Sequence, residues 1–426
     1  MIRRASRSVK KFGHRTFSSL KIRNYRLYFI GQGISLSGTW MQTIGQSWLV
    51  LEITGSGTAL GLVLAAQFLP VLFLAPLGGV IADRFSKRKI LFITQFAAGL
   101  LALILAVLVA THAATLWMIY VLASALGIVN ALDNPTRQTF VFEMVGHDDL
   151  QNAVTLNSTE VNLARVAGPA LAGIAIASVG IAASFFFNAA SYVAVLVCLL
   201  MMDADLLHRH HRRGAEHPLR ELKRGLGYAW RTPILRDILI IMAIVGTFTY
   251  EFQVSLALLA KYTFGGDAGA YALLTSAFGM GSVIGGIATA ARKKTDPRGL
   301  SAILLTFGAV ICVSAMMPTI ALAALAMILV GFCSIWFTSL GNTILQTESA
   351  PEMRSRVMAL WSVAFLGSTP IGGPIIGWIG EHADPRWGLA TGGIAAIAAG
   401  ILGAVTLKKY APHAAHTSAL RPAPEK

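Results

Sequence analysis

Charged residues are scarce in this 426-residue chain. Asp, Glu, Lys and Arg make up only 13% of it, against about a quarter of a typical soluble domain. Hydrophobic residues make up 55%, and the mean hydropathy is +0.64. A soluble chain of this length would form two or three domains, whose surfaces would need more charge. The composition therefore excludes an ordinary soluble protein and indicates that much of the apolar surface faces lipid.

Cysteine is also rare, and its placement excludes two kinds of site. Cys198, Cys312 and Cys333 all lie in apolar stretches, without the spacing of a disulfide framework or a zinc site. The chain has no G-x-x-x-x-G-K-[ST] phosphate loop, no G-x-G-x-x-G dinucleotide sequence and no H-E-x-x-H zinc motif. We therefore expect no enzyme activity, no cofactor and no metal. Energy for any work must come from a gradient or a partner.

Positive charge is abundant, and its distribution indicates a membrane protein. The net charge of +15 would suit nucleic acid in a soluble protein. Here the basic residues lie in short runs between apolar stretches, as in the cytoplasmic loops of membrane proteins. With a cytoplasmic N-terminus, all but three of the 35 Lys and Arg residues fall on the inner side; the exceptions are Arg165, Lys261 and Arg386. We expect no nucleic-acid partner, both termini in the cytoplasm, and a multi-pass protein of the bacterial inner membrane.

The apolar stretches have the length of membrane spans, for which a helix needs about 20 residues. Six precede a polar, basic segment and six follow it. The expected spans are 27–50, 58–82, 90–111, 114–136, 151–178, 181–202, 234–260, 268–291, 299–317, 320–343, 354–380 and 387–408. This pattern predicts an all-α integral membrane protein with 12 transmembrane helices in two six-helix bundles.

The same pattern divides the chain into segments. Within the connector, Leu219, Leu222, Leu226 and Trp230 recur at helical spacing, which predicts an amphipathic helix on the inner membrane surface. The expected segments are a basic cytoplasmic tail at 1–26, an N-terminal bundle at 27–202, the connector at 203–233, a C-terminal bundle at 234–408 and a cytoplasmic tail at 409–426.

The two halves share short sequences, which is typical of transporters with internal repeats. The offsets lie between 205 and 208 residues, and the spans concerned differ by six in order. The matches are Gly78–Ala82 with Gly285–Thr289, Asn134–Gln138 with Asn342–Gln346, and Gly168-Pro169 with Gly373-Pro374. They predict a duplicated six-helix unit with parallel topology.

The turn between the second and third spans carries the most specific motif. Its residues are Gly79, Asp83, Arg84, Arg88 and Lys89. A glycine allows close helix approach, and a carboxylate accepts strong hydrogen bonds from an arginine or a helix N-terminus. Such contacts would lock one conformation and open during transport. In the second half Ala290 takes the place of Asp83, so we expect the lock mainly in the first half.

This turn resembles the loop motif of the major facilitator superfamily, which reads Gly, three residues, Asp, Arg, any residue, Gly, any residue and two basic residues. Ser86 stands where the family prefers Gly. The resemblance implies two bundles around a central substrate cavity. They would rock between inward- and outward-open states, as secondary transporters do.

A second motif lies in the fifth span, at Ala164–Gly173. Gly168, Pro169 and Gly173 resemble the antiporter motif that the superfamily associates with exporters, and Arg165 lies inside it. An ordinary kinked packing helix would carry the same small residues and proline. Three further segments resemble a drug-antiporter-type subgroup that includes the enterobactin exporter and macrolide efflux proteins. They are Asn24–Tyr28, Trp40–Gln42 and Asp133–Gln138.

Ionisable residues within spans are candidates for proton coupling, because burying charge in a membrane is costly. Here they are Glu251, Arg165, Glu160 and Asp133. Glu251 lies ten residues before Lys261, about 15 Å along a helix, which is too far for a direct pair. It either carries the proton or pairs with Arg165 across the bundles. Asp133 lies near a cytoplasmic end, where a solvated structural role is an alternative.

Trp40, Gln42, Gln46 and Trp48 offer aromatic faces and amides, which suit a substrate cavity. Interfacial anchoring is the alternative for the tryptophans. Taken together, we expect a monomeric, proton-coupled exporter of small amphipathic molecules such as drugs or siderophores. The rival functions are an uptake permease, a channel, and a membrane subunit of a larger complex.

Overall fold

The computed structural model describes residues 18–208, 218–290, 297–365 and 367–410, and these residues form helices without any strand. The N-terminal bundle consists of α2 (Arg23–Thr54), α3 (Gly57–Arg84), α4 (Lys87–Ala110), α5 (Leu116–Val145), α6 (Leu150–Val179) and α7 (Ile181–Met201). The C-terminal bundle consists of α9 (Pro233–Phe248), α10 (Phe252–Leu258), the π-helical η2 (Leu259–Thr263), α11 (Ala268–Ala290), α12 (Pro297–Ala315), α13 (Ile320–Glu348), α14 (Arg354–Phe365), α15 (Thr369–His382) and α16 (Pro385–Thr406). Three short helices lie outside the bundles: η1 (Ser18–Lys21), α8 (Pro218–Arg231) and η3 (Leu407–Tyr410).

Eleven helical segments are long and apolar enough to cross a membrane. They agree with the second to twelfth expected spans, which confirms the all-α membrane class. The first expected span corresponds to α2, a helix of 32 residues that does not belong to these eleven. Its buried face carries polar side chains, among them Gln32, Gln42 and Gln46, which lower its hydropathy. The segments 1–17, 209–217 and 411–426, which include most of both expected tails, lie outside the described residues.

The two bundles share one packing pattern. In the first, α3 crosses α5 closely, because a Cβ on Gly78 would lie 2.1 Å from the Ala131 carbonyl oxygen. In the second, α11 crosses α13, and a Cβ on Gly285 would lie 2.7 Å from the Phe332 carbonyl oxygen. Gly78 and Gly285 are the residues matched by the sequence repeat. A backbone contact that excludes any side chain therefore fixes the same helix pair in both halves.

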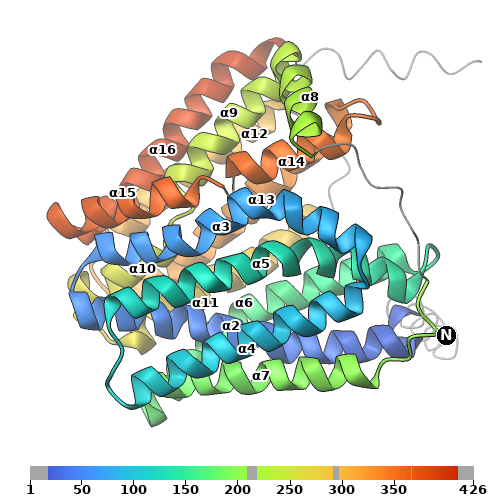
Figure 1. Cartoon of the computed structure of the whole chain (residues 1–426). Coiled ribbons are helices and arrows are strands. Elements are labelled where there is room, and N and C mark those ends of the chain that lie inside the picture. Colours follow the sequence, from blue (N-terminus) through green and yellow to red (C-terminus); the bar gives the residue numbers. More distant parts are fainter. Residues whose placement is uncertain (1–17, 209–217, 291–296, 366, 411–426) are drawn as a thin grey trace, which may run out of the picture.

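The bundles meet along two helix pairs, α3 with α15 and α6 with α11. The first contact is backbone against backbone: a Cβ on Gly61 would lie 2.3 Å from the Gly373 carbonyl oxygen, and one on Gly377 would lie 2.1 Å from that of Gly57. We call the end of the molecule with the α2–α3 turn, at Gly55 and Ser56, the far end. The end with the α3–α4 turn, at Phe85 and Ser86, is the turn end. Figure 1 shows the bundles together at the far end, on the left, and diverging to the right.

Two membrane-spanning segments of the C-terminal bundle are interrupted. They are α9 with α10 and α14 with α15, and we call each of them a broken rod. Residues 249–251 interrupt helical structure between α9 and α10, and a turn at 367 and 368 precedes α15. Non-helical backbone at membrane depth is tolerated where protein covers it. Thr249 illustrates this, because its hydroxyl donates a hydrogen bond of 2.8 Å to the Gly392 carbonyl oxygen of α16.

The connector contains the helix α8. Its Leu226 and Trp230 side chains are exposed, at 51% and 62%. Lys223 and Arg231 are exposed on the same short helix. This mixture of apolar and basic side chains is what an interfacial helix presents, and contact with the inner membrane surface stays a prediction.

Candidate functional site

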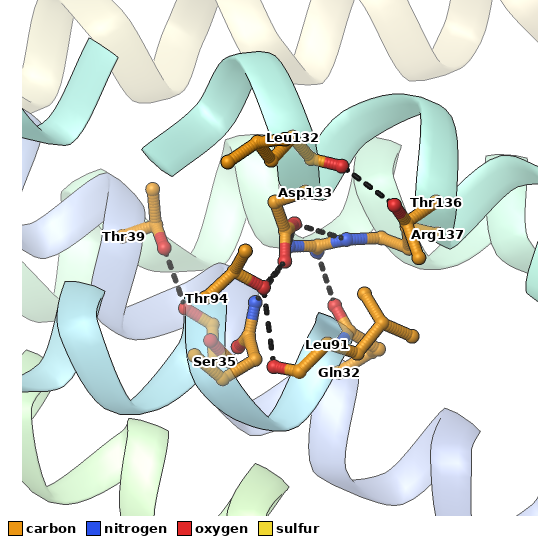
Figure 2. Close-up of polar contacts among 10 residues, drawn as sticks. Gln32, Ser35, Thr39, Leu91, Thr94, Leu132, Asp133, Thr136 and Arg137 are labelled. Carbon is orange, nitrogen blue, oxygen red and sulfur yellow. Dashed lines mark hydrogen bonds and ion pairs between the residues drawn. The ribbon is translucent and has the colours of Figure 1, made fainter. Parts of the chain in front are cut away.

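A buried charged cluster lies inside the N-terminal bundle, where α2, α4 and α5 meet (Figure 2). Asp133 on α5 is 1% exposed, and its Oδ1 accepts hydrogen bonds from Thr94 Oγ1 at 2.7 Å and Gln95 Nε2 at 2.8 Å. Its Oδ2 pairs with Arg137, whose Nε donates at 2.9 Å. Arg137 also donates to Gln32 Oε1 on α2. Asp133 is therefore not solvated, and both of its oxygens have partners.

Glu160 on α6 lies close to this cluster but differs from Asp133 in its bonding. It is 6% exposed, and neither of its carboxylate oxygens has a hydrogen-bond partner in the part of the chain that the structure describes. Its Oε1 lies 2.7 Å from the position of a Cβ on Gly33, which places it against α2. Arg137 is within electrostatic range. A buried carboxylate without bonds is costly as an anion, so Glu160 stays a candidate for proton uptake.

Glu251 lies at the break between α9 and α10. It is 3% exposed, and its Oε1 has no hydrogen-bond partner among the described residues. The start of α15 covers it: a Cβ on Gly372 would lie 3.0 Å from Oε1, and one on Gly373 would lie 3.4 Å from Oε2. Two glycines thus make room for the carboxyl between the two broken rods. Its position links the two places where helical structure in the C-terminal bundle is interrupted.

Arg165 on α6 stacks on Trp40 of α2, with its guanidinium carbon 5.7 Å from the ring centroid. Its Nε is buried and lacks a hydrogen-bond partner among the described residues. The expected alternative, an ion pair with Glu251, does not occur in this structure, within the same described ranges. Arg165 is therefore a half-buried cation on an aromatic face. It lies on the side of α6 that α11 approaches, because a Cβ on Gly279 would lie 2.8 Å from the Arg165 carbonyl oxygen.

The fifth-helix motif shapes the surroundings of this pair. A Cβ on Gly168 would lie 2.4 Å from the Cβ of Trp40, so glycine is needed for α2 and α6 to approach there. A Cβ on Gly173 would lie 2.9 Å from that of Ala272 on α11, in the other bundle. Pro169 lies inside α6 without interrupting it. The motif therefore permits close packing both within the first bundle and between the bundles.

Polar contacts join the bundles at the far end. Lys261, in η2, donates from Nζ to the Leu51 carbonyl oxygen at 2.6 Å and lies over the Trp48 ring. The Tyr262 hydroxyl donates to the Gly55 carbonyl oxygen at 2.7 Å. Both acceptors lie at the C-terminal end of α2, where the Leu51 carbonyl oxygen also accepts the backbone N–H of Gly55 at 3.0 Å. The π-helical turn places these two donors side by side.

Glu381, near the end of α15, adds a second group of far-end contacts. Its Oε2 accepts hydrogen bonds from Ser56 Oγ at 2.7 Å, Thr58 N at 2.9 Å and Thr58 Oγ1 at 2.7 Å. Ser56 is the N-cap of α3. A carboxylate of one bundle therefore binds the N-terminus of a helix in the other, where the helix dipole favours negative charge.

The turn end is built differently. Lys87 and Glu143 form a buried ion pair of 2.6 Å between α4 and α5. Arg88 donates to the carbonyl oxygens of Leu199 at 2.8 Å and Leu200 at 3.0 Å, in the last turn of α7. These contacts tie the start of α4 to its own bundle. Within the described ranges, the partners of Lys87 and Arg88 all belong to the N-terminal bundle.

The remaining residues of the turn motif are accessible. Arg84 and Lys89 are exposed, and Asp83 is partly exposed, without a hydrogen bond or ion pair to any described residue. A Cβ on Gly79 would have no atom within 4 Å. The expected lock is therefore not engaged in this conformation.

Comparison with known proteins agrees with this architecture. The family described as transmembrane secretion effector, within the major facilitator superfamily, matches residues 14–425. The chain belongs to this family. It is also similar to the solved nucleoside transporter NupG (D323A mutant), with a TM-score of 0.74 and 14% identity, over 91% of this chain and 99% of that one.

Characterised and uncharacterised relatives of this chain are described as transporters or exporters. An uncharacterised MFS-type transporter of Bacillus subtilis (strain 168), YfiS, is 25% identical over 82% of this chain and 86% of its own length. The enterobactin exporter EntS of Escherichia coli O1:K1 / APEC is 25% identical over 76% of this chain and 77% of its own. These relatives confirm the superfamily and a multi-pass protein of the bacterial inner membrane.

The four residues expected to line a substrate cavity lie in different places. Trp40 lies against α6, under Arg165 and beside Gly168. Gln42 instead faces α7, where Asn188 Nδ2 donates to its Oε1 at 2.6 Å, and Gln46 is buried. Trp48 belongs to the far-end contacts, and its Nε1 donates to Glu52 at 2.8 Å. The structure therefore keeps Trp40 beside Arg165 and separates it from the other three.

Sequence reasoning missed several residues of these clusters. The Asp133–Arg137 spacing of four residues is a signal for a helical ion pair, but the partners Gln32, Thr94 and Gln95 come from other helices. The pair of Lys87 with Glu143 was missed as well, because 56 residues separate the two. Glu381 carries no signal, because Ser56 and Thr58 lie in the other half of the chain.

Proposed function

We propose that this transporter is a secondary exporter that works by alternating access. In this proposal α2 also spans the membrane and, with the eleven other spans, brings their number to twelve. Both termini and the turn end face the cytoplasm in this proposal, because the basic residues gather there. The conformation described above is then closed to the outside. The chain acts as a monomer, with a small molecule, protons and the lipid bilayer as its partners, and without a cofactor.

The observation that carries the proposal is the one-sided contact between the bundles. At the far end, Lys261, Tyr262 and Glu381 reach across from the C-terminal bundle and bind backbone or hydroxyl groups of the other. Toward the turn end the bundles diverge (Figure 1). Opening to the outside would break these hydrogen bonds and bring the turn ends together. The turn motif around Asp83 would then find partners and lock that second state.

Proton coupling is assigned to Glu251 in this proposal. It is buried between the two broken rods, and the breaks are the natural places for these rods to bend. Glu160 is the second candidate, because neither of its oxygens has a hydrogen-bond partner. The proposal assigns Asp133 no coupling role, because both of its oxygens already accept hydrogen bonds from Thr94, Gln95 and Arg137.

Export of amphipathic molecules such as drugs or siderophores is supported by the fifth-helix motif and by the similarity to an enterobactin exporter. The test uses everted membrane vesicles, in which export appears as uptake. Vesicles that contain the chain should accumulate enterobactin when a pH gradient is imposed, and vesicles without it should not. Accumulation only in right-side-out vesicles would instead indicate an uptake permease.

Reporter fusions test the orientation. Fusions after Glu216 and at the C-terminus should report a cytoplasmic location, and a fusion at Gly266 an external one. An external signal after Glu216 would contradict the proposed orientation and the assignment of the open end.

A further inference from the structure

Arg165 carries a charge that the described residues do not neutralise. The other internal guanidinium of the N-terminal bundle, that of Arg137, pairs with Asp133 and donates to Gln32. Arg165 has neither kind of partner: its Nε is buried and unbonded, and no ion pair joins it to a described acidic residue. An isolated charge at membrane depth is costly and as a rule serves a pathway or a partner. The partner of Arg165 must therefore come from outside the described residues or from another conformation.

Groups from both bundles surround this guanidinium. Trp40 supplies a ring on the side of the N-terminal bundle, held at its position by the close contact with Gly168. Tyr250 lies in the break between α9 and α10, where its ring packs on Phe365 with the centroids 4.5 Å apart, and it is within electrostatic range of Arg165. The Tyr250 hydroxyl donates a hydrogen bond of 2.9 Å to the Ser334 carbonyl oxygen of α13. The site thus combines a cation from α6, an indole from α2 and a phenol from the break between α9 and α10.

The chemistry of these groups defines a ligand. A guanidinium is planar and donates two parallel hydrogen bonds to a carboxylate or a similar pair of oxygens. An indole ring such as that of Trp40 packs well against another aromatic ring. We propose that Arg165, Trp40 and Tyr250 form the recognition site for an anionic aromatic group of the transported molecule, such as a ring that bears a carboxylate. This inference rests on the proposed export function and narrows its substrate class.

The site would change shape when the two bundles move relative to each other. Arg165 and Trp40 move with one bundle, and Tyr250 with the other. Tyr250 lies directly before Glu251 in the chain, at the same break. A ligand bound between Arg165 and Tyr250 therefore contacts the segment that carries the proposed coupling carboxyl.

The test compares two probes that differ in charge and share a ring, 2,3-dihydroxybenzoate and its neutral amide, 2,3-dihydroxybenzamide. Binding to the purified full chain is measured by saturation-transfer NMR and titration. The wild type should bind the acid more tightly by about 10- to 100-fold, which is the usual worth of a hydrogen-bonded charge pair. Arg165→Gln should bind both probes alike, and Arg165→Lys should recover part of the preference.

Arg26→Gln is the matched control, because it removes the same charge from an exposed position of α2. It should keep the wild-type preference. Equal binding of acid and amide by the wild type would overturn the inference, and so would an unchanged preference in a folded Arg165→Gln protein. Loss of folding in Arg165→Gln together with an unchanged preference in Arg165→Lys and in Trp40→Leu would assign Arg165 a structural role. Vesicle transport separates the two proposals, since a chain that prefers the acid but accumulates nothing contradicts only the export function.

Discussion

The two bundles repeat one architecture but hold their buried charges in different ways. In the N-terminal bundle, Asp133 with Arg137 and Lys87 with Glu143 form buried ion pairs between or along its helices. In the C-terminal bundle Asp237 pairs with Arg236, and Glu251 is buried with an unbonded oxygen at a helix break. The unbonded carboxyl of the N-terminal bundle, Glu160, lies inside the continuous helix α6 instead. Paired charges fix a structure, because removing one partner leaves the other uncompensated. An unpaired carboxyl leaves its protonation free to change, which is what coupling requires.

Helix continuity differs in the same direction. Prolines at 70, 76, 135 and 169 lie inside helices of the N-terminal bundle, and those helices run on without interruption. In the C-terminal bundle the rods α9–α10 and α14–α15 are interrupted. Breaks of this kind concentrate bending at a few residues. The comparison indicates a stiff first bundle and a second bundle that supplies the hinges and the far-end contacts.

The largest expected effect comes from breaking the charged cluster of the first bundle. Asp133→Ala would leave Arg137, whose side chain is 25% exposed, without its counter-charge; breaking a fully buried pair in this way costs about 3–5 kcal/mol. We expect most of the protein to be lost or aggregated, as measured by fluorescence-detected size-exclusion chromatography. The double variant Asp133→Asn/Arg137→Gln should recover folded protein. Normal folding and stability of Asp133→Ala would contradict the structural role of this cluster.

The matched change in the second bundle should spare the fold. Glu251→Gln keeps the shape of the side chain and breaks no ion pair among the described residues, so expression and melting temperature should stay near wild type. Accumulation driven by a pH gradient should be lost, while exchange of substrate at equal pH continues. Full pH-driven accumulation by a well-folded Glu251→Gln protein would remove Glu251 from the coupling role.

Two adjacent glycines in each half allow a sharper comparison. Gly78→Ala would push a methyl group into the Ala131 carbonyl, and overpacking of this kind costs about 1–3 kcal/mol. Gly285→Ala should be destabilising for the same reason, as measured by thermal shift. Gly79→Ala and Gly286→Ala should leave the melting temperature unchanged, because a Cβ on Gly79 meets no atom within 4 Å and one on Gly286 only a side-chain carbon at 3.9 Å.

Transport rates then separate the two neutral variants. If the turn motif locks the other state, Gly79→Ala should slow turnover and Gly286→Ala should not, because the second half has Ala290 in place of the motif carboxylate. Equal rates for these two variants would indicate that Gly79 has no part in a lock.

The smallest expected effect concerns Asp83. It has no hydrogen bond or ion pair to a described residue in this conformation, so Asp83→Asn should leave stability and substrate binding unchanged. Turnover should fall by roughly three- to tenfold, the worth of one weakened charge-assisted hydrogen bond in the opposite state. Arg88→Gln serves as the contrasting variant, because Arg88 already binds the end of α7. It should lower the melting temperature, whereas Asp83→Asn should not.

The amino-acid sequence by itself determined the membrane class, the extent of the spans and the duplication. These features depend on local composition and on residues close together in the chain: about 20 apolar residues make a span whatever surrounds them. Glycines at matched offsets marked the tight crossings of α3 with α5 and of α11 with α13. The family followed from motifs of the same local kind, at the α3–α4 turn and in α6.

Only the tertiary structure decided which ionisable side chains have partners. For Asp133 the sequence left open a coupling role and a solvated structural role, and in the structure Thr94, Gln95 and Arg137 enclose it. Glu251 and Arg165 were possible partners, and the fold places Glu251 against α15 and Arg165 on Trp40. The physical reason is that burial and pairing depend on side chains brought together from helices far apart in the sequence. A composition or a spacing within one helix carries no record of that meeting.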